Sequence, residues 1–589
     1  MSRKSSKCVF VFLLIGCCAV LLLGGCSSNS EGPISVQVSP PVTAVGAGQT
    51  VQFTAIVSND ASAVTWSASS GTIDASGIFT APSQSAVVTI TATATKGGSK
   101  ASASVNVVAP GQVAATANTQ VATYTVAPAA AANVSVQFGT DMNYGLTTWT
   151  QPVPKGGGAV SLFVAGMKAS TLYHMRGVVQ FADGSQYMDG DQTFSTGAAP
   201  VAQLPAITAT TSPGMTPQSG VELLDLISLG STTVAPVAVS DLNGNILWSY
   251  NPGSAIPTGL QANPIKLLPD GHFLVNFSAV AEDGANSVLQ EVDLTGKVVW
   301  QMSAADLNKA LAAATCAGCN ITVLGTHHDF VMLPNGHLIV LAATQQDISG
   351  TTVTGDVIID LDQNHNPVWL WNEFDHLDVT RQPYMYPDWT HSNAILYSAD
   401  DGNLVISIRH QNWLVKVDYA NGAGAGDILW HLGYQGDFTL TGGTDPTDWF
   451  YAQHGPSFAS ANTTGKFSMA VFDNGDDRFF PTGQVLCTAA SASCYSTVQI
   501  VDLDETAKTA NLTFHTPAPF YSFFGGNAEV LANGNLEFCV SAESAATPNG
   551  DVYEISQAGN APTVWHLKVT GQYVYRGQRL SSLYPGVQW

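Results

Sequence analysis

The chain has 589 residues, of which 45% are hydrophobic and only 11% are charged, so it holds enough apolar material for several cores and about three or four domains. Its formal net charge of −23 argues against nucleic acid as a partner, because binding to phosphates depends on a basic surface. An anionic small substrate is compatible with this charge only where the protein provides a local cationic site.

Residues 1–25 have the features of a lipoprotein signal peptide. Basic residues precede an apolar run from Val9 to Leu23, and the sequence LGGC then ends at Cys26. This run is short for a transmembrane helix, which needs about 20 apolar residues. We therefore expect a lipid at Cys26, a short linker over residues 26–32, and a membrane-anchored protein of the cell envelope that faces the periplasm or the cell surface. The membrane that carries the anchor and the oligomeric state stay open.

Two β-sandwich modules are predicted next. In residues 33–109, short runs such as ISVQVSP and VVTITATAT alternate apolar and polar residues between Gly, Ser and Asn turns. Their order resembles the bacterial immunoglobulin-like group 2 repeat, a module to which we assign no chemistry. In residues 110–198, GMKASTLYHMRGVVQFADG and TFSTG resemble a fibronectin type III module, in which His174 and Arg176 are expected to be ordinary strand residues.

Residues 199–589 contain an internal repeat. One half of each copy is a strand, a turn and a strand, as in FVMLPNGHLIVLA, and the other half closes on an aromatic residue, as in EVDLTGKVVWQM. Six copies end near Trp248, Trp300, Trp369, Trp430, Phe514 and Trp565. A four-stranded antiparallel unit repeated six times predicts a six-bladed β-propeller, because radial closure protects the edges of such sheets. The expected fold is therefore all-β, with two β-sandwich (immunoglobulin-like) domains before the propeller.

The cysteines beyond Cys26 predict two disulfides. An oxidising compartment favours disulfides, and the close spacings in CAGC and CTAASASC predict the pairs Cys316–Cys319 and Cys487–Cys494. Cys539 lies in the apolar strand LEFCV and is interpreted as a buried thiol. CAGC upstream of THHD also resembles part of a zinc cluster, but the paired spacing of such clusters is absent, so no metal is predicted.

Three histidines occupy matched positions in successive copies of the repeat. His391 and His454 each lie eleven residues before the glycine of a hairpin turn, and His328 lies eight before its own. Equivalent positions converge near the axis of a propeller, so these histidines should meet in one cavity. Arg409 is expected to face His391 across the hairpin DWTHSNAILYSADDGNLVISIRHQNW, with Cβ atoms about 5 Å apart, close enough to hold one anion between them.

The remaining histidines of this region are interpreted as structural. His272 and His337 follow turn glycines, and the same interpretation covers His365, His376, His410, His431, His515 and His566. The role of His327 stays open: the alternation of a regular strand would point it away from His328, to the opposite face. Arg478 and Arg576 are expected either to line the same cavity or to form plain salt bridges.

Three histidines and an arginine suit the transfer of a sulfuryl group. A neutral imidazole is a nucleophile near pH 7, and cationic donors stabilise charge on the oxygens of a group that passes between oxygens. These residues resemble the bacterial arylsulfate sulfotransferases, which use no adenylylated sulfate donor. The resemblance covers roughly residues 200–589 and rests on HHDF, DWTHSN, SIRHQNWLVKVD, AQHGPSF, VFDNGDDR and VYRGQRLSSLYP.

The resemblance implies specific roles for the matched residues. His454 would be sulfated transiently, while His328, His391 and Arg409 would bind the sulfuryl oxygens. A ping-pong transfer from an aryl sulfate donor to a phenolic acceptor would follow, with no cofactor, on a six-bladed propeller. The immunoglobulin-like module and the lipid anchor depart from the family pattern, so oligomeric state and position in the envelope are not implied.

Other functions remain open at this point. The chain has no GxxxxGK[ST] loop for a nucleotide sulfate donor and no signature of the formylglycine sulfatases. Water that reached a sulfated His454 would make the protein a hydrolase. A propeller adhesin on sandwich stalks would use none of these residues for catalysis. A metal-dependent propeller hydrolase would instead use His328, His391 and His454 as ligands.

Overall fold

The computed structural model describes residues 32–200, 204–228, 237–279, 286–384, 386–476, 478, 487, 489–492, 494–544 and 547–589. Nearly all regular structure in these ranges is β-strand, and the α-helices there are the short α1 (Ala304–Ala313) and α2 (Glu373–His376). The predicted all-β class is confirmed. The predicted signal peptide and Cys26 lie outside the described residues. None of the described helices has both the length and the apolar character needed to cross a membrane.

The described chain divides into two compact units, the first formed mainly by residues 48–82 and 88–105 and the second by residues 106–589. Short strands form the sheets of the first part of the chain. These are β1 (Ser35–Ser39) with β4 (Thr54–Ser58); β2 (Val42–Gly46), β9 (Lys100–Val108), β8 (Ala86–Ala94) and β5 (Val64–Ala68); and β3 (Thr50–Gln52), β7 (Ile78–Thr80) and β6 (Thr72–Ile73). Alternate residues of β8 are buried, as its alternating sequence requires.

The second unit begins with two sheets that enclose a core around Tyr124, Val136 and Phe138. Their strands are β10 (Gln112–Ala115), β11 (Ala122–Val126) and β15 (Val160–Val164); and β13 (Leu146–Thr147), β12 (Ala132–Gly139), β16 (Leu172–Phe181) and β17 (Gln186–Met188), with β14 (Gln151–Val153) on β12 and β18 (Gln192–Ser195) on β16. His174 and Arg176 lie in β16, where His174 pairs with Asp191 and Arg176 with Gln137.

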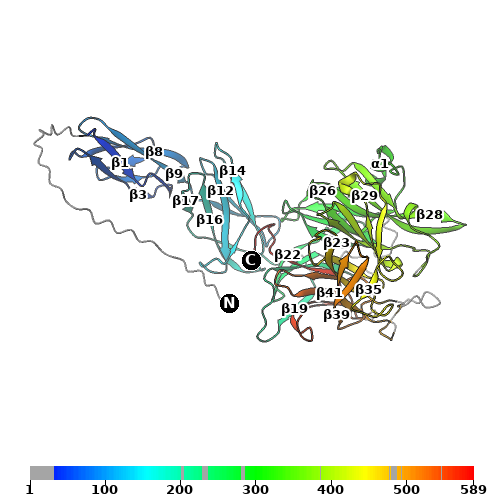
Figure 1. The fold of residues 1–589 in the computed structure, drawn as a ribbon. Helices are drawn as coiled ribbons and strands as arrows, with labels where there is room; N and C mark the ends of the chain where they lie inside the picture. The colour runs from blue at the N-terminus through cyan, green and yellow to red at the C-terminus, as the bar shows by residue number, and fades with distance from the viewer. Residues whose placement is uncertain are drawn as a thin grey trace, which may run out of the picture. The chain divides into compact units, whose positions relative to one another are not determined.

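Six sheets follow, coloured green to red in Figure 1. The first holds β22 (Ile246–Tyr250), β21 (Val237–Asp241), β20 (Val221–Ile227) and β44 (Tyr573–Leu580); the second β23 (Leu260–Leu267), β24 (Phe273–Ala279), β25 (Val288–Val292) and β26 (Val298–Ser303); the third β27 (Gly325–Met332), β28 (Leu338–Ile348), β29 (Thr351–Leu361) and β30 (Pro367–Asn372). The fourth holds β31 (Ser392–Ser398), β32 (Asn403–Ile408), β33 (Trp413–Val417) and β34 (Ile428–Leu432); the fifth β35 (Thr439–Thr441), β39 (Thr509–Pro517), β38 (Thr497–Asp504), β37 (Lys466–Asp473) and β36 (His454–Phe458); the sixth β19 (Ala206–Thr211), β43 (Thr563–Thr570), β42 (Asn549–Ile555), β41 (Leu536–Val540) and β40 (Asn527–Val530). Three short 3-10 helices, η1 (Gly253–Ala255), η2 (Arg409–Gln411) and η3 (Ala420–Gly422), lie between strands of the described chain.

Apolar cores join consecutive sheets. Trp248 and Phe273, from the first and second sheets, have ring centroids 4.4 Å apart in one such core. Similar cores join the second sheet to the third, the third to the fourth, the fourth to the fifth and the fifth to the sixth. A further core around Leu226, Trp565 and Val574 joins the sixth sheet to the first. The repeated aromatic residues belong to these cores: Trp248, Trp430 and Trp565 are buried in them, and Trp300, Trp369 and Phe514 pack against them.

Both predicted disulfides, Cys316–Cys319 and Cys487–Cys494, are present. Cys539 is a free thiol with no exposed surface, in β41. Burial raises its pKa well above the usual value for a thiol, so it is unreactive near neutral pH.

Candidate active site

The structure brings the three matched histidines together. The rings of His328, in β27, and His391, just before β31, have centroids 5.1 Å apart. Tyr575, in β44, lies beside both His328 and His454, with ring centroid distances of 5.8 and 6.2 Å. His328 and His454 are 4% and 2% exposed, so the cluster is buried.

Bulges in the first strands of three sheets aim these side chains. The pairing of β27, β31 and β36 with the next strand shifts register at His328, next to His391 and at His454. His328 and His391 adopt positive φ angles of 53° and 50°, a conformation that costs about 1 to 3 kcal/mol for a residue other than glycine. A bulge adds a residue to a strand and redirects its side chains. The matched spacing of the histidines therefore reflects a matched irregularity of the strands.

The expectation that His327 points away from His328 is wrong, because the bulge breaks the alternation of β27. The Nδ1 atoms of the two rings lie 2.7 Å apart, within hydrogen-bond distance. His327 Nε2 lies 3.0 Å from Asp356 Oδ1, and Asp356 also accepts bonds from the Thr390 hydroxyl and the Ser392 N–H. Burial would raise the pKa of Asp356, but His327 and these hydrogen bonds lower it below the usual value.

His454 is held in one tautomer. Its Nδ1 lies 2.7 Å from Asn474 Oδ1 and 3.2 Å from the Ala452 carbonyl oxygen. The amide orientation of Asn474 is set because its Nδ2 donates to two backbone carbonyl groups. Both partners of Nδ1 are acceptors, so Nδ1 carries the proton and Nε2 has a free lone pair. Burial, followed by the charge of Arg409, lowers the pKa of His454 well below its usual value, so this imidazole is neutral at neutral pH.

Arg409 is buried in η2 and is tied down by three neighbours. Its Nη1 donates to His410 Nε2 at 2.9 Å, and its Nη2 donates at 3.0 Å to both Asp476 Oδ2 and the Phe523 carbonyl oxygen. The last paired residues of the hairpin are Ser392 and Ile408, which puts Arg409 opposite His391, one residue beyond the ladder. The guanidinium is therefore fixed in orientation next to the histidine cluster.

His410, interpreted from the sequence as a structural residue, lies against the histidine cluster. This residue has no exposed surface, and its ring centroid lies 4.2 Å from that of His391. Its Nδ1 donates to the Asp388 carbonyl oxygen at 2.7 Å, and its Nε2 accepts from Arg409, so it is neutral. Asp388 Oδ2 accepts a 2.7 Å bond from His391 Nδ1. His410 thus connects Arg409 with His391.

Of the two other arginines predicted as possible site residues, Arg576 lies close to the histidine cluster and Arg478 does not contact it in the described hydrogen bonds. Arg576 donates to the backbone oxygens of His328 and Asn393, at 3.3 and 2.6 Å, and therefore lies against the bulges. Arg478 is 1% exposed and forms a 2.5 Å ion pair with Asp473, so its role is structural.

Most of the other histidines that were expected to be structural have partners outside the site. Four pair with carboxylates: His272 with Glu291, His337 with Asp360, His431 with Asp437 and His566 with Asp551. Two stack on tryptophan: His365 on Trp300 and His376 on Trp371.

Several residues of the site were missed in the sequence. Asn474, Tyr575 and His410 lie within VFDNGDDR, VYRGQRL and SIRHQNW, motifs already singled out for their neighbours. The residue types alone did not indicate a place in the site, because the role of such a side chain becomes clear only once its hydrogen-bond partner or ring neighbour is known.

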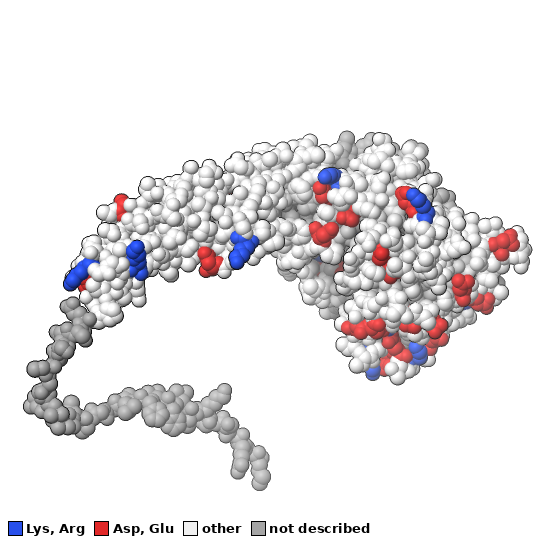
Figure 2. All heavy atoms as spheres, turned by 90° about the horizontal axis from the view of Figure 1, so that it is seen from above, with Lys and Arg blue, Asp and Glu red and all other residues white. Residues whose placement is uncertain are grey.

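The charge at the site differs from the charge at the surface. Among the charged side chains on the face shown in Figure 2, acidic ones predominate, whereas Arg409 is 6% exposed. The cation that an anionic substrate requires is therefore inside the protein.

One group in this region has the composition of a metal site. Ligand atoms of Asp388, His391 and His410 lie within 4.8 Å of one another. This group contains only one of the three histidines that the metal hypothesis names. A cation there would also face the guanidinium of Arg409, which already donates to His410.

The site lies within the part of the chain that a family model matches. A model described as Arylsulfotransferase (ASST) matches residues 211–576, whereas no curated protein matches the chain. Among solved structures, a Bacteroides uniformis protein described as a candidate 6-phosphogluconolactonase is 8% identical, with a TM-score of 0.31 over 76% of this chain and 99% of that chain. An ectodomain fragment of ICAM-5 is 10% identical, with a TM-score of 0.16 over 56% of this chain and 99% of the fragment.

Neither structural likeness is close enough to carry an argument about fold or function. The family match does support a conclusion, because it covers more than half of the chain and its range includes His328, His391, Arg409 and His454. The chain therefore belongs to the arylsulfotransferase (ASST) family.

Proposed function

We propose that this protein is an arylsulfate sulfotransferase that moves a sulfuryl group from an aryl sulfate donor to a phenolic acceptor through a sulfated His454. The observation that carries the proposal is the bond from His454 Nδ1 to Asn474, which leaves a nucleophilic Nε2 beside Arg409. Membership of the arylsulfotransferase family supports the reaction class. The aromatic rings around the site, including Tyr575 and Tyr384, suit an aryl substrate.

The first half-reaction would sulfate the histidine. His454 Nε2 attacks sulfur, a nitrogen–sulfur bond forms, and the bond from sulfur to the aryl oxygen breaks, so that its electron pair leaves with the phenolate. Arg409, with His328 and His391 beside it, would bind the sulfuryl oxygens and stabilise their charge. The product imidazole is positively charged, and its Nδ1–H stays bonded to Asn474. That charge keeps the new bond labile.

The second half-reaction would transfer the group to the acceptor. The phenolic oxygen attacks sulfur, and the electrons of the nitrogen–sulfur bond return to His454 Nε2. The phenolic proton needs a base, and His391 can accept it on Nε2 because its Nδ1–H is held by the Asp388 carboxylate. The acceptor's sulfate ester and the free enzyme result.

We also propose that the six sheets are the blades of a six-bladed β-propeller. Consecutive sheets share cores, and the sixth shares one with the first. Strands from both ends of the region complete the first and sixth sheets, where β44 joins β20 and β19 joins β43. This is the arrangement expected of a ring that the chain closes non-covalently.

The remaining features are proposals that rest on the sequence. Residues 33–109 and 110–198 would be immunoglobulin-like and fibronectin-like modules before the catalytic region, residues 199–589. Cys26 would carry the lipid that holds the protein in the cell envelope, facing the periplasm or the surface. The two disulfides suit such an oxidising compartment.

A kinetic experiment tests the transfer. The protein is mixed with 4-nitrophenyl sulfate, and nitrophenolate is followed with and without added phenol, and with and without EDTA. Continuous release that needs phenol and ignores EDTA is expected, together with loss of release in His454→Ala. Steady release without acceptor would indicate a sulfatase. Unimpaired release by His454→Ala would overturn the proposal.

A metal-dependent hydrolase is the second candidate, favoured only by the grouping of Asp388, His391 and His410. It predicts loss of activity with EDTA and recovery on addition of a divalent metal ion. Activity that survives exhaustive chelation would exclude it. A non-catalytic adhesin predicts no release under any of these conditions.

A further inference from the structure

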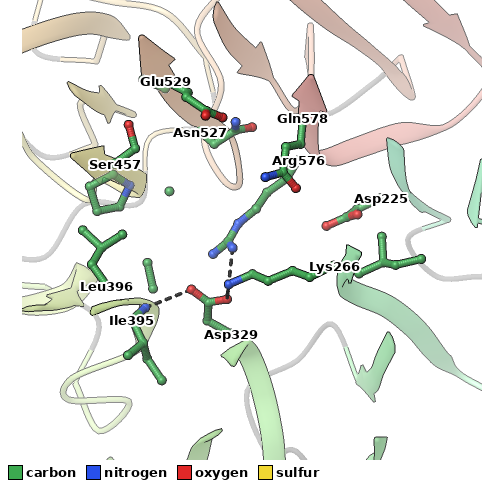
Figure 3. A pocket seen from close by; sticks show the side chains of 15 residues that line it. Asp225, Lys266, Asp329, Ile395, Leu396, Ser457, Asn527, Glu529, Arg576 and Gln578 are labelled. Carbon is green, nitrogen blue, oxygen red and sulfur yellow. Dashed lines mark hydrogen bonds and ion pairs between the residues drawn. The ribbon is translucent and has the colours of Figure 1, made fainter. Parts of the chain in front are cut away.

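A cavity of about 200 Å³ lies next to the candidate active site, because Asp329 and Gly455 of its lining directly follow His328 and His454 in the chain. All six sheets contribute to its lining, through Asp225, Lys266, Asp329, Ile395, Ser457 and Glu529, with Arg576 from β44 (Figure 3). Five of the seven are ionisable, and two of them, Asp225 and Asp329, are only 2% and 3% exposed.

Two cationic side chains in this cavity share one carboxylate. Lys266 Nζ lies 2.6 Å and Arg576 Nη1 3.2 Å from the same oxygen of Asp329, and Figure 3 shows the two chains reaching Asp329 from different sides. Burial would raise the pKa of Asp329, but the two cations lower it below the usual value, so it is ionised. Among these three groups one positive charge is left over; burial lowers the pKa of Lys266, and the charge of Asp329 beside it opposes that shift.

Two further carboxyl groups, Asp225 and Glu529, line the cavity. Burial raises the pKa of Asp225 to about 8, so at neutral pH most molecules carry a neutral carboxyl there. Burial also raises the pKa of Glu529. At the centre of the cavity, two cationic side chains therefore share the single carboxylate of Asp329, within a protein whose formal net charge is −23.

Hydrogen-bond donors are also in surplus. Lys266 has three N–H groups, of which two are taken by Asp329 and the Phe330 carbonyl oxygen. Asp225 Oδ2 and Arg576 Nε have no hydrogen-bond partner in the described part of the chain, although both atoms are buried. Asp225 is 2% exposed, and a neutral carboxyl can donate. Buried polar groups rarely stay unpaired, so an acceptor is missing.

We infer that this cavity is a binding site for a small oxyanion such as inorganic sulfate. Such an ion would accept bonds from Asp225, Lys266 and Arg576 and would balance the remaining positive charge. A metal cation is disfavoured because the Asp329 carboxylate is already shared by two cations. The inference does not depend on the proposed function, since none of these three side chains takes part in the transfer.

Selenate, a sulfate analogue that scatters X-rays anomalously, locates such a site directly. Crystals of the protein soaked in selenate are expected to show an anomalous peak between Lys266 and Arg576, separate from any peak beside His454. The Lys266→Met variant should lose the first peak only. Two results would overturn the inference. One is a cavity that holds only water while selenate gives a peak beside His454. The other is a peak between Lys266 and Arg576 that is unchanged in Lys266→Met.

A solution measurement keeps the test independent of crystals. In the Arg409→Ala background, which weakens the site beside His454, sulfate should raise the Tm more than chloride at equal ionic strength. Adding Lys266→Met, or Lys266→Gln if the first variant does not fold, should remove that difference. A difference that persists would contradict the inference. Sulfuryl transfer by the Lys266→Met variant, measured in the absence of added sulfate, tests the proposed function separately from the proposed oxyanion site.

Discussion

Asn474 determines which nitrogen of His454 is free. An Asn474→Leu variant removes the acceptor for Nδ1–H, so the ring can rotate or change tautomer, and the sulfation rate should fall about 100-fold or more, since loss of tautomer control in a comparable site is costly. Asn474→Asp, which keeps an acceptor oxygen at the same place, is the matched control and should keep more activity. Burst amplitude and rate with 4-nitrophenyl sulfate measure both. Equal rates in the wild type and the leucine variant would refute this role.

The lowered pKa of His454 predicts an unusual pH profile. A histidine with an ordinary pKa of about 6.5 would lose about 90% of its neutral form by pH 5.5. The folded protein keeps His454 neutral to lower pH, because burial and Arg409 oppose its protonation. The sulfation step in a quenched single-turnover assay should therefore stay nearly level from pH 7.5 to about 5.5. A tenfold fall centred on pH 6.5 would show that His454 titrates normally.

The same shift has a consequence for stability. The unfolded chain binds protons at His328, His410 and His454 below pH about 6.5, whereas the folded chain resists them, because burial lowers the pKa of each well below the usual value. These groups therefore contribute stability that is present above pH 6.5 and is lost as pH falls, by up to about 1.4 kcal/mol per pH unit for each histidine. Replacing His410 by Asn should flatten the acid side of the unfolding free energy against pH, and urea unfolding measures that slope.

At the scale of elements, the bulge of β36 depends on a glycine. Gly455 has a φ of +43°, and a Cβ added there would lie 2.5 Å from the Asn527 Cβ in β40. Gly455→Ala should push β36 from β40, destabilise the protein by about 1 to 3 kcal/mol and reduce activity, because His454 is adjacent. Gly534→Ala, with a φ of +84° but open space around the new atom, is the control for backbone strain alone. Equal losses of stability in the two variants would mean that the clash is relieved without effect.

At the scale of the whole molecule, Trp589 joins the sandwich of residues 112–195 to the six sheets. Its Nε1 donates to the Thr147 carbonyl oxygen at 2.8 Å, its ring lies 6.0 Å from Phe138, and Gly166 leaves room for it. Trp589→Ala should cost about 2 to 4 kcal/mol, because a large ring and one hydrogen bond are lost. Limited proteolysis should then cut faster between the sandwich and the sheets, while transfer activity is kept. Unchanged cleavage would show that other contacts hold the two parts.

Much of the architecture was readable from local patterns. Alternating runs and a repeat ending on an aromatic residue predicted antiparallel sheets, because the strand period and the turn glycines are properties of short segments. The disulfides followed from close spacing, which leaves few alternatives. The matched positions of His328, His391 and His454 came from aligning hairpin turns.

Other features depended on contacts between distant segments. Nothing local to His454 points to Asn474, because the two meet only when β36 pairs with β37. Nothing near Arg409 points to Asp476, because the two meet only when the fourth sheet packs against the fifth. The side on which His327 lies was misjudged, since alternation assumes a regular strand and the bulge of β27 is irregular. The sequence by itself determined the all-β class, the repeat, the disulfides and the family. The tertiary structure decided which nitrogen of His454 is free, how Arg409 is held and where unpaired charge gathers, because hydrogen bonding and burial depend on neighbours that are remote in sequence.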